Sequence, residues 1–256
     1  MTVSLNWLPE TAFIYILLFC RIGSILMLMP ALGEQMIPAR MRLTFALAFT
    51  LVLFPLLSRT MPVLPTEFSA TVALIFHEVA IGLMLGAITR ITVMATQVAG
   101  AVVAFQAGLS AAQVADPTQN GVQGAVIGTF LSFVGVTLIF ATDLHHVALA
   151  GIYDSYMVFL PTDPLMFEDA SQLAIKTVAH AFTIGIQMSA PFLVFGLVFN
   201  LGAGILSRLM PALQVYFLLM PANIIVGLLL FGLLLSMMMG WYLSSYEEHL
   251  AMLRGL

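Results

Sequence analysis

The sequence predicts an all-α membrane protein, and three observations lead to this fold class. Of the 256 residues, 61% are hydrophobic and only 8% are charged, whereas an ordinary globular domain carries about 25% charged residues. The hydrophobic residues gather in runs of the length that crosses about 30 Å of hydrocarbon as a helix. The connections between these runs carry proline and charge. Most of the surface must therefore face lipid or partner protein.

Six hydrophobic runs reach or approach the roughly 20 residues that a membrane-spanning helix needs. They cover residues 11–29, 41–57, 68–95, 121–141, 173–206 and 213–243. The fifth run is longer than one span and contains Pro191, which predicts a kink or a break. A weakly polar stretch over 97–120 and a polar connection over 143–169 separate the runs on either side of them. We expect one domain over residues 1–256, with some helices bent or broken.

Charge and cysteine content exclude several classes of function. The net charge is −4, and no basic stripe is present that would neutralise nucleic-acid phosphates. Cys20 is the single cysteine, so neither an intrachain disulfide nor a cysteine-based zinc site can form. We therefore expect no nucleic-acid partner and no bound cofactor.

Two stretches are similar to enzyme motifs, and neither is sufficient to predict catalysis. His77-Glu78 begins an HExxH-like string, but Ile81 stands where the second metal-binding histidine is required. Ser110, with His180 on a later hydrophobic run, is superficially similar to an intramembrane serine protease. A serine nucleophile needs a base within hydrogen-bond reach, which sequence cannot show. The protease remains a minor alternative, and the favoured prediction is a protein without catalytic activity.

His145 and His146 follow Asp143 after the fourth hydrophobic run. We expect them at the end of that helix, where polar residues meet the membrane interface. Adjacent residues of a helix point about 100° apart, so the two rings are not expected to share a metal ion. The sequence therefore favours an interfacial cap and predicts no metal site.

Charged and small residues inside the hydrophobic runs are more informative. Arg21, Glu78 and Arg90 lie in or at the ends of these runs, where ionised groups must pair, snorkel or face a wet cavity. They either line a pathway or form an interhelical ion pair such as Arg21 with Glu78. Two GxxxG motifs allow helix backbones to approach closely in lipid; they are Gly82 with Gly86, and Gly124 with Gly128.

The segment between the third and fourth runs combines polar side chains with glycine. Backbone of this kind is tolerated at membrane depth only where protein buries it or water bathes it. It is either an ordinary solvated loop or a loop that occupies a pore. Its candidate plug and gating residues are Gln106, Gly108, Ser110, Gln113, Asp116, Pro117, Asn120 and Gly121.

The ordered succession of these residues resembles the FliR family of flagellar biosynthetic proteins and its injectisome relatives. The matching positions extend over nearly the whole chain and are Arg21, Gly23, Pro30, Gly33, Pro38, Arg40, Glu78, Gly82, Gly86, Gly100, Gln106, Gly108, Asp116, Pro117, His145, Ser155, Pro161, Pro191, Asn200, Gly204, Arg208, Pro211 and Pro221. The chain departs from the family at Gln214, where an asparagine is common.

The resemblance implies a structural and gating subunit of the flagellar type III protein export channel. Such proteins assemble with FliP-like and FliQ-like proteins, near an FlhB-like switch protein, and pass unfolded protein substrates. The complex would lie in the bacterial inner membrane at the flagellar basal body, raised towards the periplasm. Residues of about 1–160 and 161–256 would be FliP-like and FliQ-like parts, and the loop 106–121 would plug the pore.

Two alternatives to the flagellar function stay open. One is the homologous export gate of an injectisome. The other is a small secondary transporter, a class that commonly shows two halves related by an internal repeat. No counterpart of the proline-containing run 173–206 is evident in the first half of the chain, so this alternative is less favoured.

Overall fold

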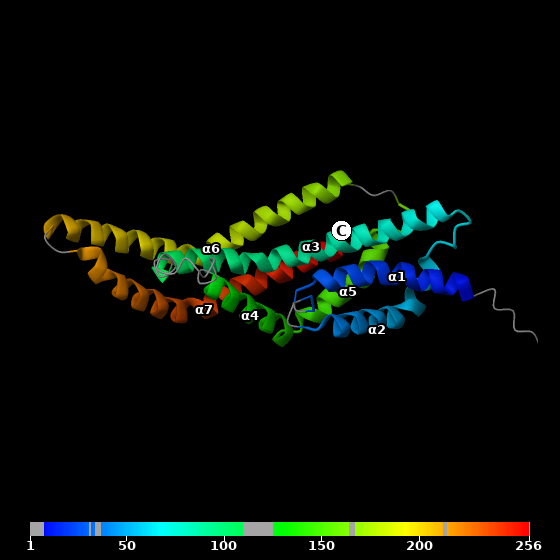
Figure 1. The fold of residues 1–256 in the computed structure, drawn as a ribbon, viewed down its shortest axis with the longest axis horizontal. Helices are drawn as coiled ribbons and strands as arrows, with labels where there is room; N and C mark the ends of the chain where they lie inside the picture. The colour runs from blue at the N-terminus through cyan, green and yellow to red at the C-terminus, as the bar shows by residue number, and fades with distance from the viewer. Residues whose placement is uncertain are drawn as a thin grey trace, which may run out of the picture. The chain divides into compact units, whose positions relative to one another are not determined.

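A computed structural model describes residues 8–30, 32–33, 37–109, 125–163, 167–211 and 214–255. Within these ranges all regular structure is helical (Figure 1). In chain order the helices are α1 (Leu8–Leu28), α2 (Ala39–Leu57), the short 3-10 helix η1 (Ser58–Thr60), α3 (Phe68–Gln106), α4 (Ala125–Ala141), α5 (Leu144–Val158), α6 (Phe167–Leu209) and α7 (Val215–Gly255). The predicted all-α fold class is confirmed.

Five of the helices, α1, α2, α3, α6 and α7, are long and apolar enough to cross a membrane. The bent pair α4 and α5 brings the number to 6 if it counts as one span. Among the described residues, the count of hydrophobic helices therefore agrees with the six runs of the sequence.

Two stretches that were expected to be polar connections are helical. The third helix does not end near residue 95 but continues to Gln106. Its polar side chain at Gln97 finds a partner, because Nε2 donates to Ser132 Oγ of α4 at 2.8 Å. The expected connection over 143–169 contains α5, whose buried face includes Leu144, Ala148 and Ile152. The first prediction was wrong because a polar residue with a tertiary partner does not end a helix, and the second because the residues of α5 that recur at helical spacing are buried.

The expectation of a break at Pro191 is also wrong, since α6 is continuous from Phe167 to Leu209 with this proline inside it. Proline removes one backbone hydrogen bond and usually bends a helix without having to end it. Pro55 and Pro221 likewise lie inside α2 and α7. The alternative of a kink at Pro191 stays a prediction.

The chain divides into two compact units, and the first contains α1, α2, the start of α3 and α5. It comprises residues 1–91, 143–177 and 249–256. The α1 and α2 helices lie side by side (Figure 1), and Tyr15 Oη of α1 donates to Leu47 O of α2 at 2.9 Å. Large side chains with no more than 1% exposure fill its interior, among them Leu17, Ile22 and Ile88.

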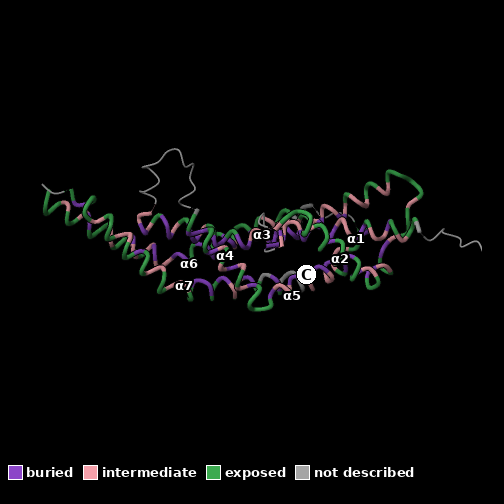
Figure 2. The backbone as a smooth tube through the Cα atoms, turned by 60° about the horizontal axis from the view of Figure 1, so that its bottom comes forward, coloured by how far each residue is buried: buried purple, intermediate pink, exposed green. Residues whose placement is uncertain are grey.

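The second unit comprises residues 92–142 and 178–248, and it is built from the rest of α3, α4 and most of α6 and α7. Phe192 and Met188 of α6 and Leu131 of α4 are fully buried in it. Towards the connection between α6 and α7 most residues are exposed (Figure 2). There Phe217 and Leu218 are 77% and 74% exposed. These helices present a long apolar surface that the unit itself does not cover.

Candidate functional site

A buried pair of opposite charges lies in the first unit. Arg21 of α1 and Glu78 of α3 are both 0% exposed. Arg21 Nε donates to Glu78 Oε2 at 2.7 Å, and Arg21 Nη2 donates to Oε1 at 2.6 Å. This two-bond geometry is the strongest form of arginine–carboxylate pairing. Each charge thus has the partner that burial in an apolar environment requires.

The third nitrogen of Arg21 binds the end of α5. Its Nη1 donates to Ser155 O at 3.1 Å and to Phe159 O at 2.9 Å. Ser155 O also accepts from the backbone N–H of Phe159. The carboxyl-terminal end of a helix carries partial negative charge, so a cation there is favourable. The guanidinium also lies over the Tyr156 ring, 4.1 Å from its centroid. One arginine therefore joins α1, α3 and α5.

Glycine on α3 allows this meeting of helices. A Cβ added at Gly82 would lie 2.6 Å from Arg21 O, and one at Gly86 would lie 2.8 Å from Leu28 Cβ. Helices approach this closely in membranes when small residues face each other. The motif that the sequence singled out thus brings α3 against α1, beside the charged pair. Arg90, the third predicted charge, lies partly buried farther along α3.

His77 adds a titratable group to this cluster, which sequence reasoning missed. In the sequence His77 stands out only as the first residue of the incomplete zinc motif. In the structure His77 Nδ1 lies 3.5 Å from Glu78 Oε1, and its Nε2 lies 2.8 Å from Asp163 O. The available signal was its position next to a glutamate inside a hydrophobic run.

The second candidate site is the start of the predicted plug segment, at the end of α3. Gly108 has a φ of +73°, which glycine adopts without the penalty that a Cβ incurs. A Cβ there would lie 2.7 Å from Asn223 Nδ2 of α7. Asn223 Nδ2 also donates to Gln106 O at 3.3 Å. The backbone of this turn therefore rests directly against α7.

Two further glycines, on α6 and α7, allow this turn to pack closely against these helices. The Gln106 side chain occupies the position that a Cβ on Gly196 of α6 would take. A Cβ on Gly227 of α7 would lie 2.6 Å from Ala107 Cβ. We call residues 105–108, together with these contacts on α6 and α7, the loop base. It fixes where the polar segment leaves α3.

The rest of the predicted plug lies outside the described residues: Ser110, Gln113, Asp116, Pro117, Asn120 and Gly121. Gly124 of the second GxxxG motif lies outside them too. Gly128 is described, and it packs against α3, where a Cβ on Gly100 would collide with the Gly128 backbone. A Cβ on Gly128 would lie 2.6 Å from Gln97 Oε1. In the second unit α3 and α4 are therefore in close backbone contact.

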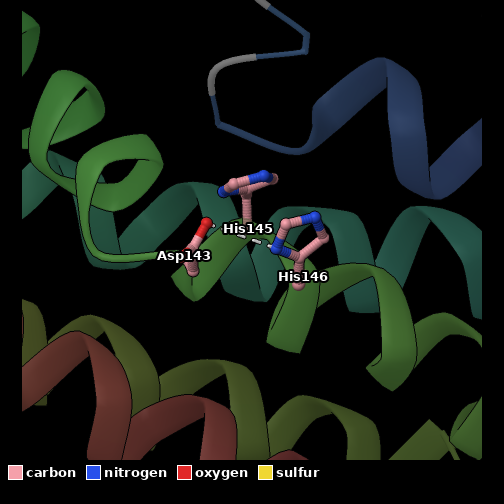
Figure 3. A group of neighbouring side chains, drawn as sticks. All are labelled: Asp143, His145 and His146. Atoms are coloured by element: carbon pink, nitrogen blue, oxygen red, sulfur yellow. Dashed lines mark ion pairs between the residues drawn. The ribbon is translucent and has the colours of Figure 1, made fainter.

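Asp143, His145 and His146 form what we call the histidine cluster (Figure 3). The two histidines lie in the first turn of α5, not at the end of α4, which corrects their predicted place. Their ring centroids are 4.0 Å apart, and one ligand atom of each residue lies within 4.8 Å of the others. Asp143, with a φ of +59°, breaks the helix and turns its carboxylate towards the imidazoles.

The reason given against a shared metal ion was that adjacent residues of a helix point about 100° apart. His145 and His146 are adjacent in α5, yet their rings lie close together, so this reason does not hold. The Asp143 and His146 side chains are 78% and 68% exposed. They are 3.5 Å apart at Oδ1 and Nδ1, as an i,i+3 ion pair. The absence of a bound metal remains a prediction.

Other features of the described residues bear on the alternatives. His180 Nε2 lies 3.2 Å from Ser245 Oγ, which gives it a structural partner on α7. In the first unit a cavity of about 40 Å³ is lined mainly by apolar groups, among them Ile25, Leu85 and Ile152. This volume has room for a few water molecules at most, and small-molecule sites are far larger.

The fold and these sites define a helical membrane protein with a large uncovered apolar surface and a buried ion pair that organises its first unit. The chain belongs to the family of bacterial export proteins, family 1, which it matches over residues 12–249. The predicted resemblance to the FliR family is confirmed.

The relatives cover most of the chain and most of their own length. The chain is 43% identical over 232 residues to the flagellar biosynthetic protein FliR of Caulobacter vibrioides, covering 91% of this chain and 92% of the relative. It is 30% identical to FliR of Bacillus subtilis, over 84% and 83% of the two chains. It is 23% identical to the Yop proteins translocation protein T of Yersinia pestis, over 88% and 87%.

Proposed function

We propose that this chain is a structural and gating subunit of the flagellar type III protein export channel. Its relatives include flagellar biosynthetic proteins at 43% and 30% identity. In this proposal FliP-like and FliQ-like proteins are its partners in the gate, an FlhB-like switch protein lies beside it, and unfolded proteins pass through. The chain has no catalysis of its own.

The observation that carries this proposal is the length of the apolar helices. The candidate spans in α3 and α6 contain 39 residues each, and that in α7 contains 34. At 1.5 Å per residue these stretches are about 51–58 Å long, whereas the hydrocarbon core of a bilayer is about 30 Å thick. Lipid tails alone cannot cover them.

Many side chains along the spans in α6 and α7 are apolar and exposed. Leu229 and Leu233 of α7 are 69% and 77% exposed, and Leu197 and Val198 of α6 are both 63% exposed. A surface of this kind in contact with water would be strongly unfavourable. We infer that neighbouring subunits cover the part that lipid does not, as expected for one member of a helical assembly.

The loop 106–121 is the proposed plug of the channel. Its polar composition suits a wet lumen, and the loop base holds its first residues against α6 and α7. Gly108 is the proposed hinge, because its left-handed backbone and its contact with Asn223 both exclude a side chain. The proposal extends to a complex in the bacterial inner membrane at the flagellar basal body, raised towards the periplasm. Within this chain, the proposed FliP-like part covers residues of about 1–160 and the proposed FliQ-like part residues of about 161–256.

An injectisome remains the second candidate, because a Yop translocation protein is 23% identical over 88% of the chain. The two systems share the chemistry of unfolded-chain export, and the higher identity of the flagellar relatives favours the flagellum. Complementation separates them. Expressed in a strain that lacks the flagellar relative, this chain should restore swimming. Expressed in a strain that lacks the injectisome relative, it should not restore secretion.

Co-expression tests the assembly. Produced with FliP-like and FliQ-like proteins, the chain should co-purify with both in detergent as one stable complex. Phe217→Glu, which places a charge on the exposed surface of α7, should weaken this recovery if a partner covers that position. Glu248→Gln, at the polar end of the same span, is the matched control. A chain recovered only as a monomer that carries a solute into liposomes would support the transporter instead.

A further inference from the structure

His77 holds an unusual position at the edge of the buried charge cluster. Its side chain is 12% exposed, and its two ring nitrogens face two different oxygen atoms. We propose that His77 is a proton-binding site, at which Nδ1 binds a proton and then donates a hydrogen bond to the Glu78 carboxylate. The proposal concerns this chain alone and does not depend on the export function.

The hydrogen-bond partner of Nε2 fixes which nitrogen carries the first proton. Nε2 lies 2.8 Å from Asp163 O, and a backbone carbonyl oxygen can only accept a hydrogen bond. Nε2 must therefore be the donor. A neutral imidazole has one N–H group, so neutral His77 has a lone pair at Nδ1.

That lone pair points at a carboxylate. Nδ1 is buried and has no hydrogen-bond partner among the residues that the structure describes, and Glu78 Oε1 is 3.5 Å away. In the neutral state two acceptors face each other, and a buried acceptor is left unsatisfied, which is unfavourable. A proton at Nδ1 turns this contact into a charge-assisted hydrogen bond, whose usual length of about 2.7–2.9 Å needs only a small closure.

The step is simple in its chemical balance. A hydronium ion supplies the proton: one of its O–H bonds breaks, one N–H bond forms at Nδ1, a water molecule is left, and the charge of the cluster rises by one. The release of the proton to water reverses it. Histidine is the side chain whose charge ordinarily changes between pH 5 and 8, so the site would couple this buried cluster to the pH of its surroundings.

Groups on several elements set how readily the proton binds. The charged groups that face it are Glu78 on the same helix and Arg21 on α1. Oε1 would then accept from both Arg21 Nη2 and His77 Nδ1. Among the described residues, further ionisable side chains on these elements are Cys20 on α1, Tyr156 on α5 and Asp163 after α5.

Histidine C2 hydrogen exchange, read by mass spectrometry on the full chain in detergent between pH 5 and 8.5, tests the proposal. This exchange rate rises with pH while the imidazole is protonated and levels off once it is neutral. The His77 rate should rise from pH 5 before levelling off. A rate that is already level at pH 5 would overturn the proposal.

The variant Glu78→Gln identifies the acceptor. A hydrogen bond to a charged group contributes about 1.5–3 kcal/mol, so His77 should hold its proton at least about tenfold more weakly in the variant. His180, which contacts Ser245 in the second unit, is the internal control, and its curve should not move. An unchanged His77 curve in the folded variant would overturn the proposal. If the variant does not fold, the wild-type curve decides alone.

Discussion

Removing Arg21 should be among the most destabilising single changes in the first unit. Arg21→Met keeps much of the apolar volume but takes both donors from the Glu78 carboxylate and the Nη1 donor from Ser155 O and Phe159 O. Breaking a buried pair by removing one partner costs about 3–5 kcal/mol, because the other charge stays buried without compensation. We expect a loss of stability in that range.

The double variant Arg21→Met/Glu78→Met separates the pair from the packing around it. Once both charges are gone, neither is left uncompensated. The loss of stability in the double variant should therefore be clearly smaller than the sum of the losses in the two single variants. Contacting residues ordinarily show interaction energies of about 0.5–3 kcal/mol, and a fully buried pair should lie at the upper end.

Stability can be measured as resistance of the detergent-solubilised chain to unfolding in sodium dodecyl sulfate, followed by circular dichroism. Gly202→Ala is a suitable control, because a Cβ at that position meets nothing within 4 Å. If the two single changes add without an interaction term, the pair does not organise the unit, and the reasoning is refuted.

Other outcomes follow from the same contacts. Gly100→Ala should destabilise the second unit by about 1–3 kcal/mol, because the new methyl group meets the α4 backbone. The control Gly202→Ala should change little in the same unfolding assay. Equal effects of the two changes would contradict the close α3–α4 contact. Gly108→Val should slow export without making membranes leaky, and export at the normal rate would remove Gly108 as the hinge. Ser110→Ala and His180→Ala should leave export intact, whereas complete loss with normal assembly would revive the protease alternative. Metal analysis of the purified chain should find no stoichiometric zinc at the histidine cluster, and one zinc per chain that His146→Gln removes would contradict this.

Sequence reasoning reached the helical runs because hydropathy reports the cost of placing each residue in lipid. It also singled out Arg21 and Glu78, since a charge in an apolar run needs a partner. It could not show that Arg21 also binds the end of α5, because those acceptors are backbone carbonyl groups more than 130 residues away. Their positions depend on the tertiary fold.

The missed elements have specific physical reasons. The buried residues Leu144, Ala148, Ile152 and Ser155 recur at helical spacing, so a periodicity count over this stretch indicates α5 even though its acidic residues suggested a loop. The end of α3 was placed too early because Gln97 looked unfavourable in lipid, and the structure gives it Ser132 as a partner. The left-handed Asp143 has no sequence signature as clear as a glycine, so the histidine cluster was misplaced.

The central claim, that this chain gates a channel through its polar segment, can be tested by one permeability measurement. Cells would carry the complete gate with residues 113–119 shortened, and the entry of a small solute would be compared with that in cells with the intact chain at equal complex abundance. If the segment plugs a wet passage, the shortened variant should assemble and leak. Unchanged permeability at normal abundance would contradict the claim.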